Sequence, residues 1–426
     1  MAGRNSGQET TTTMITVENI NKAAKRLQGI SLHTPLQYNL QLSEEFGCNV
    51  YLKREDLQVV RSYKLRGAYN KISSLTEVEK QKGVVCASAG NHAQGVAYSC
   101  KKLNIRGTIF MPATTPSQKV LQVKFFGKDN VEVVLTGDTF DDAYKAAVKF
   151  CNEKNSTFVH PFDDEKVIEG QATVAKEILD DADFKVDYLL VPVGGGGLAA
   201  GTVSYFSALS ESTKLVGVEP EGAPSMKTSL QNGFNTELTE IDKFVDGAAV
   251  KKAGDKTFEI CKDKLHDVVL VPEGKVCTTI LNLYNQQAIV AEPAGALTIT
   301  ALHFLKEELN GKNVVCIVSG SNNDIMRTEE IRERSLLYEG MKHFFMIRFP
   351  QRAGALKEFV SEVLGPQDDI VHFEYMKKNN RESGPALIGL EIKSPSDVDL
   401  LKRKMKEKNF QYEYLNKNDN LLRFLV

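Results

Sequence analysis

The sequence predicts an α/β protein, in which helices cover both faces of parallel sheets, followed by a small ferredoxin-like module. Between residues 83 and 318, short apolar runs alternate with segments of helical periodicity. Parallel strands that are buried on both faces give continuous apolar runs of this kind. From residue 343 onward, the strand-like segments alternate apolar and polar residues and follow the order strand, helix, strand, strand, helix, strand. That order is typical of a ferredoxin-like βαββαβ fold.

The elements of the larger part follow from local patterns taken in chain order. Val17, Ile20, Ala24 and Leu27 recur at helical spacing, which predicts a helix over residues 17–28. Further helices are expected from Ala93, over 117–126, from 140 to 151, over 166–180, from about Ala199, and over 276–289 and 294–309. Strands are expected over residues 48–52, 84–88, 108–111, 131–135, 157–159, 188–193, 215–219, 268–271 and 314–318, where apolar runs end at polar or glycine-containing turns.

The tail is expected to form a separate module. Its strands are expected over residues 343–349, 370–376, 386–392 and 410–415, and its helices over 354–364 and 395–408. The boundary is expected near residues 330–340, after a charged helical segment. The first residues, 1–15, are rich in Ser, Thr, Gly and Gln and are expected to form a flexible tail.

Composition excludes several classes of function. A net charge of −2 gives no bulk attraction to nucleic acid or to an anionic membrane;. The chain has no apolar run of about 18 residues, so no membrane span is expected. Its seven cysteines are widely spaced and form no CxxC. This pattern predicts no disulfide framework and no metal site, and it favours a reducing, cytoplasmic compartment.

Four consecutive glycines, Gly194 to Gly197, lie between a predicted strand and a predicted helix. Such a loop lets backbone N–H groups approach an anion, and the helix dipole favours negative charge there. The spacing matches neither a dinucleotide fingerprint nor a P-loop. A phosphate monoester on a small cofactor fits better, although a tight turn without a ligand is the simpler alternative.

Two other strands end in polar, glycine-containing loops, Ser88 to His92 and Ser319 to Asn322. Ligands of doubly wound sheets bind outside the carboxyl ends of the strands, so these loops could converge on one crevice. The alternative for Ser88 to His92 is an ordinary helix start. For Glu219 and Glu292, which precede prolines, an ordinary exposed charge is the favoured interpretation.

Lys64 lies among small, apolar and basic neighbours, and local sequence alone does not separate it from a surface lysine. Together with the other motifs, however, its segment resembles the pyridoxal-phosphate-dependent threonine dehydratases, which have the tryptophan-synthase-β-like fold. The resemblance covers residues 16–426. It rests on five ordered motifs: Ser62 to Ala68, Ser88 to Gly95, Gly194 to Leu198, Glu292 to Ala296, and Ser319 to Asn322.

The resemblance implies a fold-type-II pyridoxal-phosphate enzyme with two doubly wound parallel-sheet subdomains in a catalytic domain of residues 16–335. The smaller subdomain would cover about 55–160. Lys64 would carry the cofactor covalently and later remove the Cα proton. The remaining cofactor contacts would be the pyridine hydroxyl with Asn91, the pyridine nitrogen with Ser319, and the phosphate with Gly194, Gly195, Gly196, Gly197 and Leu198.

The same resemblance implies how the amino-acid substrate binds and reacts. Its carboxylate would be held by the loop of Ser88, Ala89, Gly90, Asn91 and His92. A serine at position 319, unlike an aspartate, would not keep the pyridine nitrogen protonated, which favours expulsion of the β-hydroxyl. The products would be a 2-oxo acid and ammonia, so L-threonine is the expected substrate.

Related activities remain as alternatives. Serine racemases of this family carry a second serine where this chain has Ala89, so dehydration is expected rather than racemisation. A serine or threo-hydroxyamino-acid dehydratase is the enzymatic runner-up. A non-catalytic amino-acid sensor is the runner-up of another class, and the retention of Lys64, Asn91, the glycines and Ser319 counts against it.

The tail resembles the regulatory, ACT-like domain of threonine dehydratases. Phe349 to Leu356 matches the family signature F-P-E-R-P-G-A-L, with Gln351 in place of a glutamate and Ala353 in place of a proline. One such module fits within residues 340–426. The resemblance implies feedback inhibition by isoleucine, opposed by valine, and a homo-oligomer, either a dimer or a tetramer. A domain that serves only oligomerisation or stability is the alternative.

Overall fold

The computed structural model of the chain describes residues 15–375 and 383–418. The expected flexible tail therefore lies outside the described residues, apart from Ile15. The chain forms two compact units: residues up to 271 together with 289–323, and residues 272–288 together with 324–426. The expected domain boundary near residues 330–340 stays a prediction. Among the described residues, no helix is long and apolar enough to cross a membrane.

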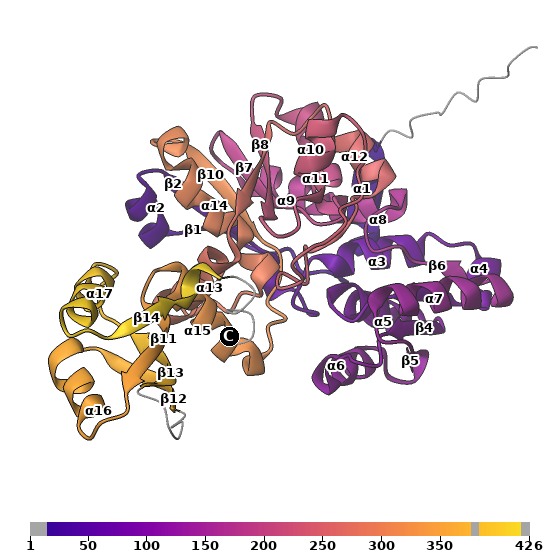
Figure 1. The fold of residues 1–426 in the computed structure, drawn as a ribbon. Helices are drawn as coiled ribbons and strands as arrows, with labels where there is room; N and C mark the ends of the chain where they lie inside the picture. Colours follow the sequence, from indigo (N-terminus) through magenta and orange to yellow (C-terminus); the bar gives the residue numbers. More distant parts are fainter. Residues whose placement is uncertain (1–14, 376–382, 419–426) are drawn as a thin grey trace, which may run out of the picture. The chain divides into compact units, whose positions relative to one another are not determined.

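Six strands form the larger sheet of the first unit, in the order β1-β2-β10-β7-β8-β9 (Figure 1). All neighbouring pairs are parallel except β1 and β2, which are antiparallel. Every residue of β7 is buried, which explains its continuous apolar sequence. The strands are β1 (Leu36–Tyr38), β2 (Asn49–Arg54), β7 (Tyr188–Pro192), β8 (Lys214–Pro220), β9 (Asp267–Val271) and β10 (Asn313–Val318).

Helices of this subdomain bury their apolar sides against the sheet. Leu198, Val203 and Phe206 of one helix share a core with Val191 and Val315 of the strands. The helices are α1 (Val17–Leu27), α2 (Leu40–Phe46), α8 (Glu165–Gln171), α9 (Thr173–Asp181), α10 (Gly197–Leu209), α11 (Ser225–Asn232), α12 (Asp255–Cys261) and α14 (Pro293–Leu309).

The smaller sheet of the first unit has the order β5-β4-β3-β6, and all of its pairs are parallel. Its strands are β3 (Val84–Ala87), β4 (Gly107–Met111), β5 (Val131–Leu135) and β6 (Thr157–Phe158), and its helices are α3 (Lys64–Ser73), α4 (Glu77–Lys82), α5 (Asn91–Leu103), α6 (Ser117–Gly127) and α7 (Phe140–Lys154). The expected pair of parallel-sheet subdomains is thus confirmed, with an added antiparallel edge strand, β1.

The second unit contains an antiparallel sheet of order β12-β13-β11-β14. Its elements run β11 (Lys342–Pro350), α16 (Ala355–Glu358), β12 (Asp369–Tyr375), β13 (Ser383–Glu391), α17 (Asp397–Glu407) and β14 (Gln411–Tyr414). This order confirms the βαββαβ prediction. Its core contains Phe345, Phe349, Phe359 and Phe410. The unit also includes α13 (Glu273–Gln287) and α15 (Thr328–Tyr338).

Two helix predictions were wrong in detail. The single helix expected over residues 166–180 is two helices, α8 and α9, which meet at Ala172. Just before this break, a Cβ placed on Gly170 would lie 2.4 Å from the carbonyl oxygen of Arg66, so tertiary packing fixes the path of the chain here. The helix expected over 354–364 is the four-residue α16 followed by a π-helical turn, Phe359–Val363. Short 3₁₀ turns cover Glu55–Leu57 (η1), Lys128–Asn130, Ile325–Arg327 and Leu415–Lys417.

Candidate active site

Lys64 is the first residue of α3 and lies beside the carboxyl end of β10. The backbone N–H of Tyr63 donates to the carbonyl of Ser319 at 3.2 Å, and the N–H of Ser321 donates to the carbonyl of Arg61 at 2.9 Å. These two bonds pair residues 61–63 with residues 319–321. Arg61, the first residue of this pairing, adopts a positive φ of 58°. The structure therefore brings together two motifs that are more than 250 positions apart.

The surroundings of Lys64 favour the neutral form of its amine, which nucleophilic chemistry requires. The side chain is half-buried, and Nζ donates to the carbonyl of Pro161 at 2.9 Å. Burial lowers the pKa of Lys64 to about 8, although the carboxylate of Glu292 opposes the shift. Among the described residues, the amine of Lys64 contacts the Pro161 carbonyl and the ring of Tyr63, and it forms no ion pair. A lysine with such a pKa is partly neutral in weakly alkaline solution and can attack a carbonyl group.

The four glycines connect the end of β7 to the start of α10. Gly196 has a φ of 88°, which only glycine adopts without strain. The first hydrogen bond of α10 runs from the N–H of Ala200 to the carbonyl of Gly196 at 2.8 Å. The N–H groups of residues 197–199 precede that bond and have no acceptor within the helix. This helix end can therefore receive an anion such as a phosphate.

A segment that sequence reasoning missed, His160 to Asp163, connects Lys64 to the glycine loop. The carbonyl of Pro161 accepts from Lys64, and a Cβ placed on Gly195 would lie 2.2 Å from the ring of Phe162. The carboxylate of Asp163 accepts from the N–H of Lys256 at 2.9 Å, at the start of α12. Its sequence offered no signal, because a backbone carbonyl is present in every residue.

The loop after β3 holds the next group of candidates. The hydroxyl of Ser88 accepts from the N–H of Gly90 at 3.2 Å, and the space beside Gly90 is open. His92 is buried, and its Nε2 lies 2.8 Å from the carbonyl of Val159. Burial, together with the positive charge of Lys64, lowers the pKa of His92 to about 3. Its ring is therefore neutral.

Asn91 is held by two hydrogen-bond partners that lie far from it in the sequence. Its Nδ2 donates to Oε1 of Glu292 at 2.6 Å, and its Oδ1 accepts from Nδ2 of Asn322 at 2.6 Å. Glu292 is only 6% exposed, so the interpretation of this residue as an exposed charge was wrong. Burial raises the pKa of Glu292 to about 7, and the hydrogen bond from Asn91 works against that shift. The EPAGA motif was the signal that could have placed it here.

Ser319 closes the site on the side of β10. Its side chain is buried, and its hydroxyl donates to the carbonyl of Ala294 at 3.3 Å. A Cβ placed on Gly295 would lie 2.2 Å from the carbonyl oxygen of Gly320. The start of α14 and the end of β10 can approach this closely only because residue 295 is glycine. In the same way, Glu219, at the end of β8, is buried and accepts from the N–H of Met226 at 2.8 Å, so it too is not an exposed charge.

Comparison with known proteins decides the family. Residues 29–320 match the pyridoxal-phosphate-dependent enzyme family, and residues 333–425 match the C-terminal regulatory domain of threonine dehydratase. The biosynthetic L-threonine dehydratase IlvA of Halalkalibacterium halodurans is 60% identical over 412 residues, which cover 97% of this chain and 99% of that protein. This chain belongs to the pyridoxal-phosphate-dependent threonine dehydratases. The Bacillus subtilis IlvA is 55% identical, with coverage of 97% of this chain and 98% of that protein.

Solved structures of the family have the same fold. The processed form of threonine deaminase isoform 2 from Solanum lycopersicum gives a TM-score of 0.72 at 38% identity, covering 75% of this chain and 88% of that one. A serine racemase from Dictyostelium discoideum gives 0.68 at 31% identity, covering 74% of this chain and 100% of that one. Threonine dehydratases and racemases thus share this scaffold, and individual site residues must separate their activities.

The residues around Lys64 fit the cofactor of the threonine dehydratase family. Three buried polar atoms near this lysine have no hydrogen-bond partner in the described part of the chain: Ser62 Oγ, His92 Nδ1 and Gln171 Oε1. Gln171 also donates to the carbonyl of Pro161 at 3.3 Å, the same oxygen that accepts from Lys64. Buried polar atoms are nearly always hydrogen-bonded. Free groups at this place therefore suit a bound molecule with polar atoms of its own.

Proposed function

We propose that this chain catalyses the dehydration and deamination of L-threonine to 2-oxobutanoate and ammonia, the first step of isoleucine biosynthesis. The observation that carries the proposal is the Lys64 amine, which has a lowered pKa and donates to the carbonyl of Pro161, next to Phe162, whose ring packs against Gly195 of the glycine loop. The close relatives that are named biosynthetic L-threonine dehydratases support the choice of substrate. The seven free cysteines and the absence of a membrane-spanning helix among the described residues support action in the cytoplasm.

Each part of the cofactor has a proposed contact in the chain. Lys64 carries it covalently, and Asn91 retains one amide hydrogen for the pyridine hydroxyl because Glu292 occupies only the other. Ser319 would face the pyridine nitrogen. The phosphate would be held by Gly194, Gly195, Gly196, Gly197 and the amide of Leu198. Bound pyridoxal phosphate supplies an electron sink that makes the Cα proton of an amino acid acidic.

The chain's own groups then perform the proton transfers. We assign removal of the Cα proton to the neutral amine of Lys64, since burial keeps its pKa near 8;. We assign the substrate carboxylate to the loop of Ser88, Ala89, Gly90, Asn91 and His92. His92 is a poor proton donor or acceptor, because its ring is buried and neutral. The position of Ala89, which offers no second base, favours dehydration over racemisation.

A direct test measures 2-oxo acid formation by the purified full-length protein from L-threonine and from L-serine, together with any D-serine formed. We expect 2-oxobutanoate from threonine, a slower reaction with serine and no D-serine. In Lys64→Ala, the visible band of the lysine-bound cofactor and the activity should both be lost. If borohydride still fixes the cofactor to the Lys64→Ala protein, the assignment of Lys64 is wrong.

We further propose that the second unit binds isoleucine, with valine as its antagonist, and that the enzyme is a homo-oligomer. A cavity of about 320 Å3 in this unit supports the effector proposal. Phe349, Phe373 and Tyr375 give it an aromatic wall, and Arg352, which also pairs with Glu358, contributes a guanidinium that can bind a carboxylate;. Isoleucine should raise the threonine concentration needed for half-maximal rate in wild type but not in Arg352→Leu. An unmoved saturation curve in wild type would refute the proposal.

A further inference from the structure

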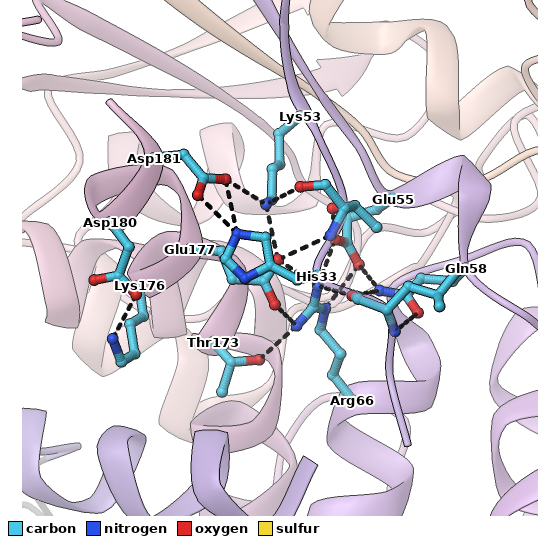
Figure 2. Close-up of polar contacts among 12 residues, drawn as sticks. His33, Lys53, Glu55, Gln58, Arg66, Thr173, Lys176, Glu177, Asp180 and Asp181 are labelled. Atoms are coloured by element: carbon cyan, nitrogen blue, oxygen red, sulfur yellow. Dashed lines mark hydrogen bonds and ion pairs between the residues drawn. The ribbon is translucent and has the colours of Figure 1, made fainter. Parts of the chain in front are cut away.

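A buried charge cluster, which includes none of the proposed cofactor contacts, lies against α3 (Figure 2). We call Lys53, Glu55, Arg66 and Glu177 the Arg66 cluster. Lys53 and Glu55 are completely buried, and Arg66 is 1% exposed. The Arg66 guanidinium pairs with both carboxylates through two hydrogen bonds each. They measure 2.8 and 2.7 Å to Glu55, and 2.6 and 2.8 Å to Glu177.

The Arg66 cluster connects four elements to one another. Glu55 begins η1, directly after β2 of the larger sheet, and Glu177 lies in α9. Arg66 is the third residue of α3. Lys53 adds a further bond from β2, since its Nζ lies 2.7 Å from Oε2 of Glu177. The first turn of α3 is thereby fixed both to the larger sheet and to one of its covering helices.

Lys64 and Arg66 point in opposite directions from the same turn. Two residues correspond to about 200° of rotation about a helix axis, so Arg66 holds the turn from the side opposite Lys64. Tight backbone packing adds to this restraint. A Cβ placed on Gly67 would lie 2.8 Å from the carbonyl oxygen of Val167 in α8. Helices α8 and α9 follow the His160 to Asp163 segment, whose Pro161 carbonyl accepts from the Lys64 amine.

Stability alone does not explain such a cluster. Burying paired charges costs several kcal/mol of desolvation per ion, and apolar replacements of whole buried pairs are often neutral or stabilising. What the cluster provides is geometry: a guanidinium with two bidentate carboxylate partners has little freedom to move. Burial opposes the charged form of Glu177, yet Arg66 and Lys53 lower its pKa below the ordinary value, so the pair stays ionised.

We propose that Arg66 is a positioning residue for Lys64. Its bonds to Glu55 and Glu177 fix the first turn of α3, and with it the place of the Lys64 amine beside Pro161. The inference rests on the proposed function of Lys64 as the covalent anchor of the cofactor. The hydrogen-bond partners of Arg66 include neither Lys64 nor any residue that is proposed to contact the cofactor.

The structure also provides a route for chemical rescue. A cavity of about 410 Å3 is lined by Arg66, Thr173 and Glu177, together with Lys176, His33 and residues of α1 and its following turn. Arg66→Ala would extend this cavity to the two glutamates, which would then lack their main partner. A free guanidinium ion has the shape and charge that those carboxylates bound before the change. It should therefore restore the geometry of the turn, although it is not covalently attached to α3.

The experiment compares full-length wild type, Arg66→Ala and Arg66→Lys, each with and without guanidinium at a concentration far below that which unfolds wild type. One readout is the pH midpoint at which Lys64 reacts in a competitive labelling experiment on cofactor-free protein. The others are the pH titration of the visible band in holoenzyme, kcat and KM. We expect Arg66→Ala to shift both midpoints and to lower kcat by about 100-fold, the cost of displacing a catalytic group by about 1 Å. Added guanidinium should reverse these changes in Arg66→Ala.

Lys176→Ala is the matched control, because Lys176 lines the same cavity but pairs with Asp180 rather than with the cluster. It should show wild-type midpoints and no response to guanidinium. Unchanged midpoints and kcat in Arg66→Ala would overturn the proposal, and so would a folded variant that guanidinium does not rescue. If Arg66→Ala does not fold, the proposal is tested on Arg66→Lys and Glu177→Gln, with the same pH midpoints of Lys64 labelling and of the visible band. Borohydride trapping in Lys64→Ala tests the anchor separately, so failure of the two ideas can be told apart.

Discussion

The side-chain amide of Asn91 donates to the carboxylate of Glu292 at 2.6 Å, although the two residues are 201 positions apart. The bond joins the loop after β3 of the smaller sheet to the start of α14 of the larger subdomain. Glu292 also acts on Lys64, because its charge raises the pKa of that amine while burial lowers it. One buried carboxyl group therefore orients a proposed cofactor contact and tunes the proposed nucleophile.

Glu292→Gln should lower the pKa of Lys64 below its present value of about 8. The substitution keeps an acceptor for Asn91 but removes the negative charge that favours the protonated amine. The carboxyl group is charged only above its own pKa of about 7, so the difference from wild type should appear above that pH. Competitive labelling of Lys64 in cofactor-free protein, over a series of pH values, measures the pKa of its amine as a pH midpoint.

Glu219→Gln is the control for this change. Burial also raises the pKa of Glu219 to about 7, but its partners are the start of α11 and not the site around Lys64. The pH midpoint of Lys64 labelling in Glu219→Gln should equal that of wild type. A Lys64 midpoint that stays at about 8 in Glu292→Gln would show that the two groups are not coupled.

Binding of the cofactor by cofactor-free protein should accelerate as the pH rises through about 8. Only the neutral form of the Lys64 amine can attack an aldehyde, and burial lowers its pKa to about that value from 10.5;. Stopped-flow absorbance at a series of pH values measures the rate. A midpoint near that of an exposed lysine would contradict the buried environment of Lys64.

Gly195→Ala should weaken cofactor binding. The added Cβ would lie 2.2 Å from the ring of Phe162, so the ring or the glycine loop must shift, and a core overpacked in this way costs about 1–3 kcal/mol. Fluorescence titration of cofactor-free protein measures the dissociation constant. The double variant Gly195→Ala, Phe162→Ala removes the clash and should bind more tightly than Gly195→Ala alone. Equal affinity of the two variants would mean that the ring does not set the shape of the loop.

Phe359→Ala should destabilise the second unit by about 3–5 kcal/mol, as loss of a buried phenylalanine usually does. Phe359 is fully buried, with ring centroids of Phe349 and Phe410 at 5.3 and 5.5 Å. Denaturant unfolding followed by tyrosine fluorescence measures the loss. Val360→Ala, at a neighbouring position that is 47% exposed, should cost far less. Similar losses in both variants would contradict the packing of this core.

The fold could be predicted from the sequence where local periodicity and burial agree. The strands Tyr188–Pro192 and Asn313–Val318 were placed to within one residue, because continuous apolar runs have few other uses. Helix α3 was not predicted: its sequence has a central glycine and three basic residues, and the partners of Arg66 come from residues 55 and 177. Tertiary pairing at such distances leaves no local pattern.

In the site too, local patterns could be predicted from the sequence and tertiary contacts could not. The loops around Lys64 were predictable because glycine runs and polar strand ends are visible in the sequence, and the structure does bring them together. Glu292 was misjudged because a charged residue before a proline usually lies on the surface, and only its tertiary neighbours reveal its burial. Pro161 was missed because its contribution is a backbone carbonyl.

The pairing of β2 with β10 has a consequence for how the enzyme is made. Val50 pairs with Val314, and Arg54 pairs with Val318. When the smaller subdomain has been synthesised, β10 has not yet been made. At that stage β2 has no parallel neighbour, and Lys64 has no Ser319 beside it. Contacts between such distant segments form slowly and late. The nascent protein should therefore acquire affinity for its cofactor only after about three quarters of the chain has left the ribosome, and premature termination anywhere earlier should yield a product that cannot be rescued by added cofactor.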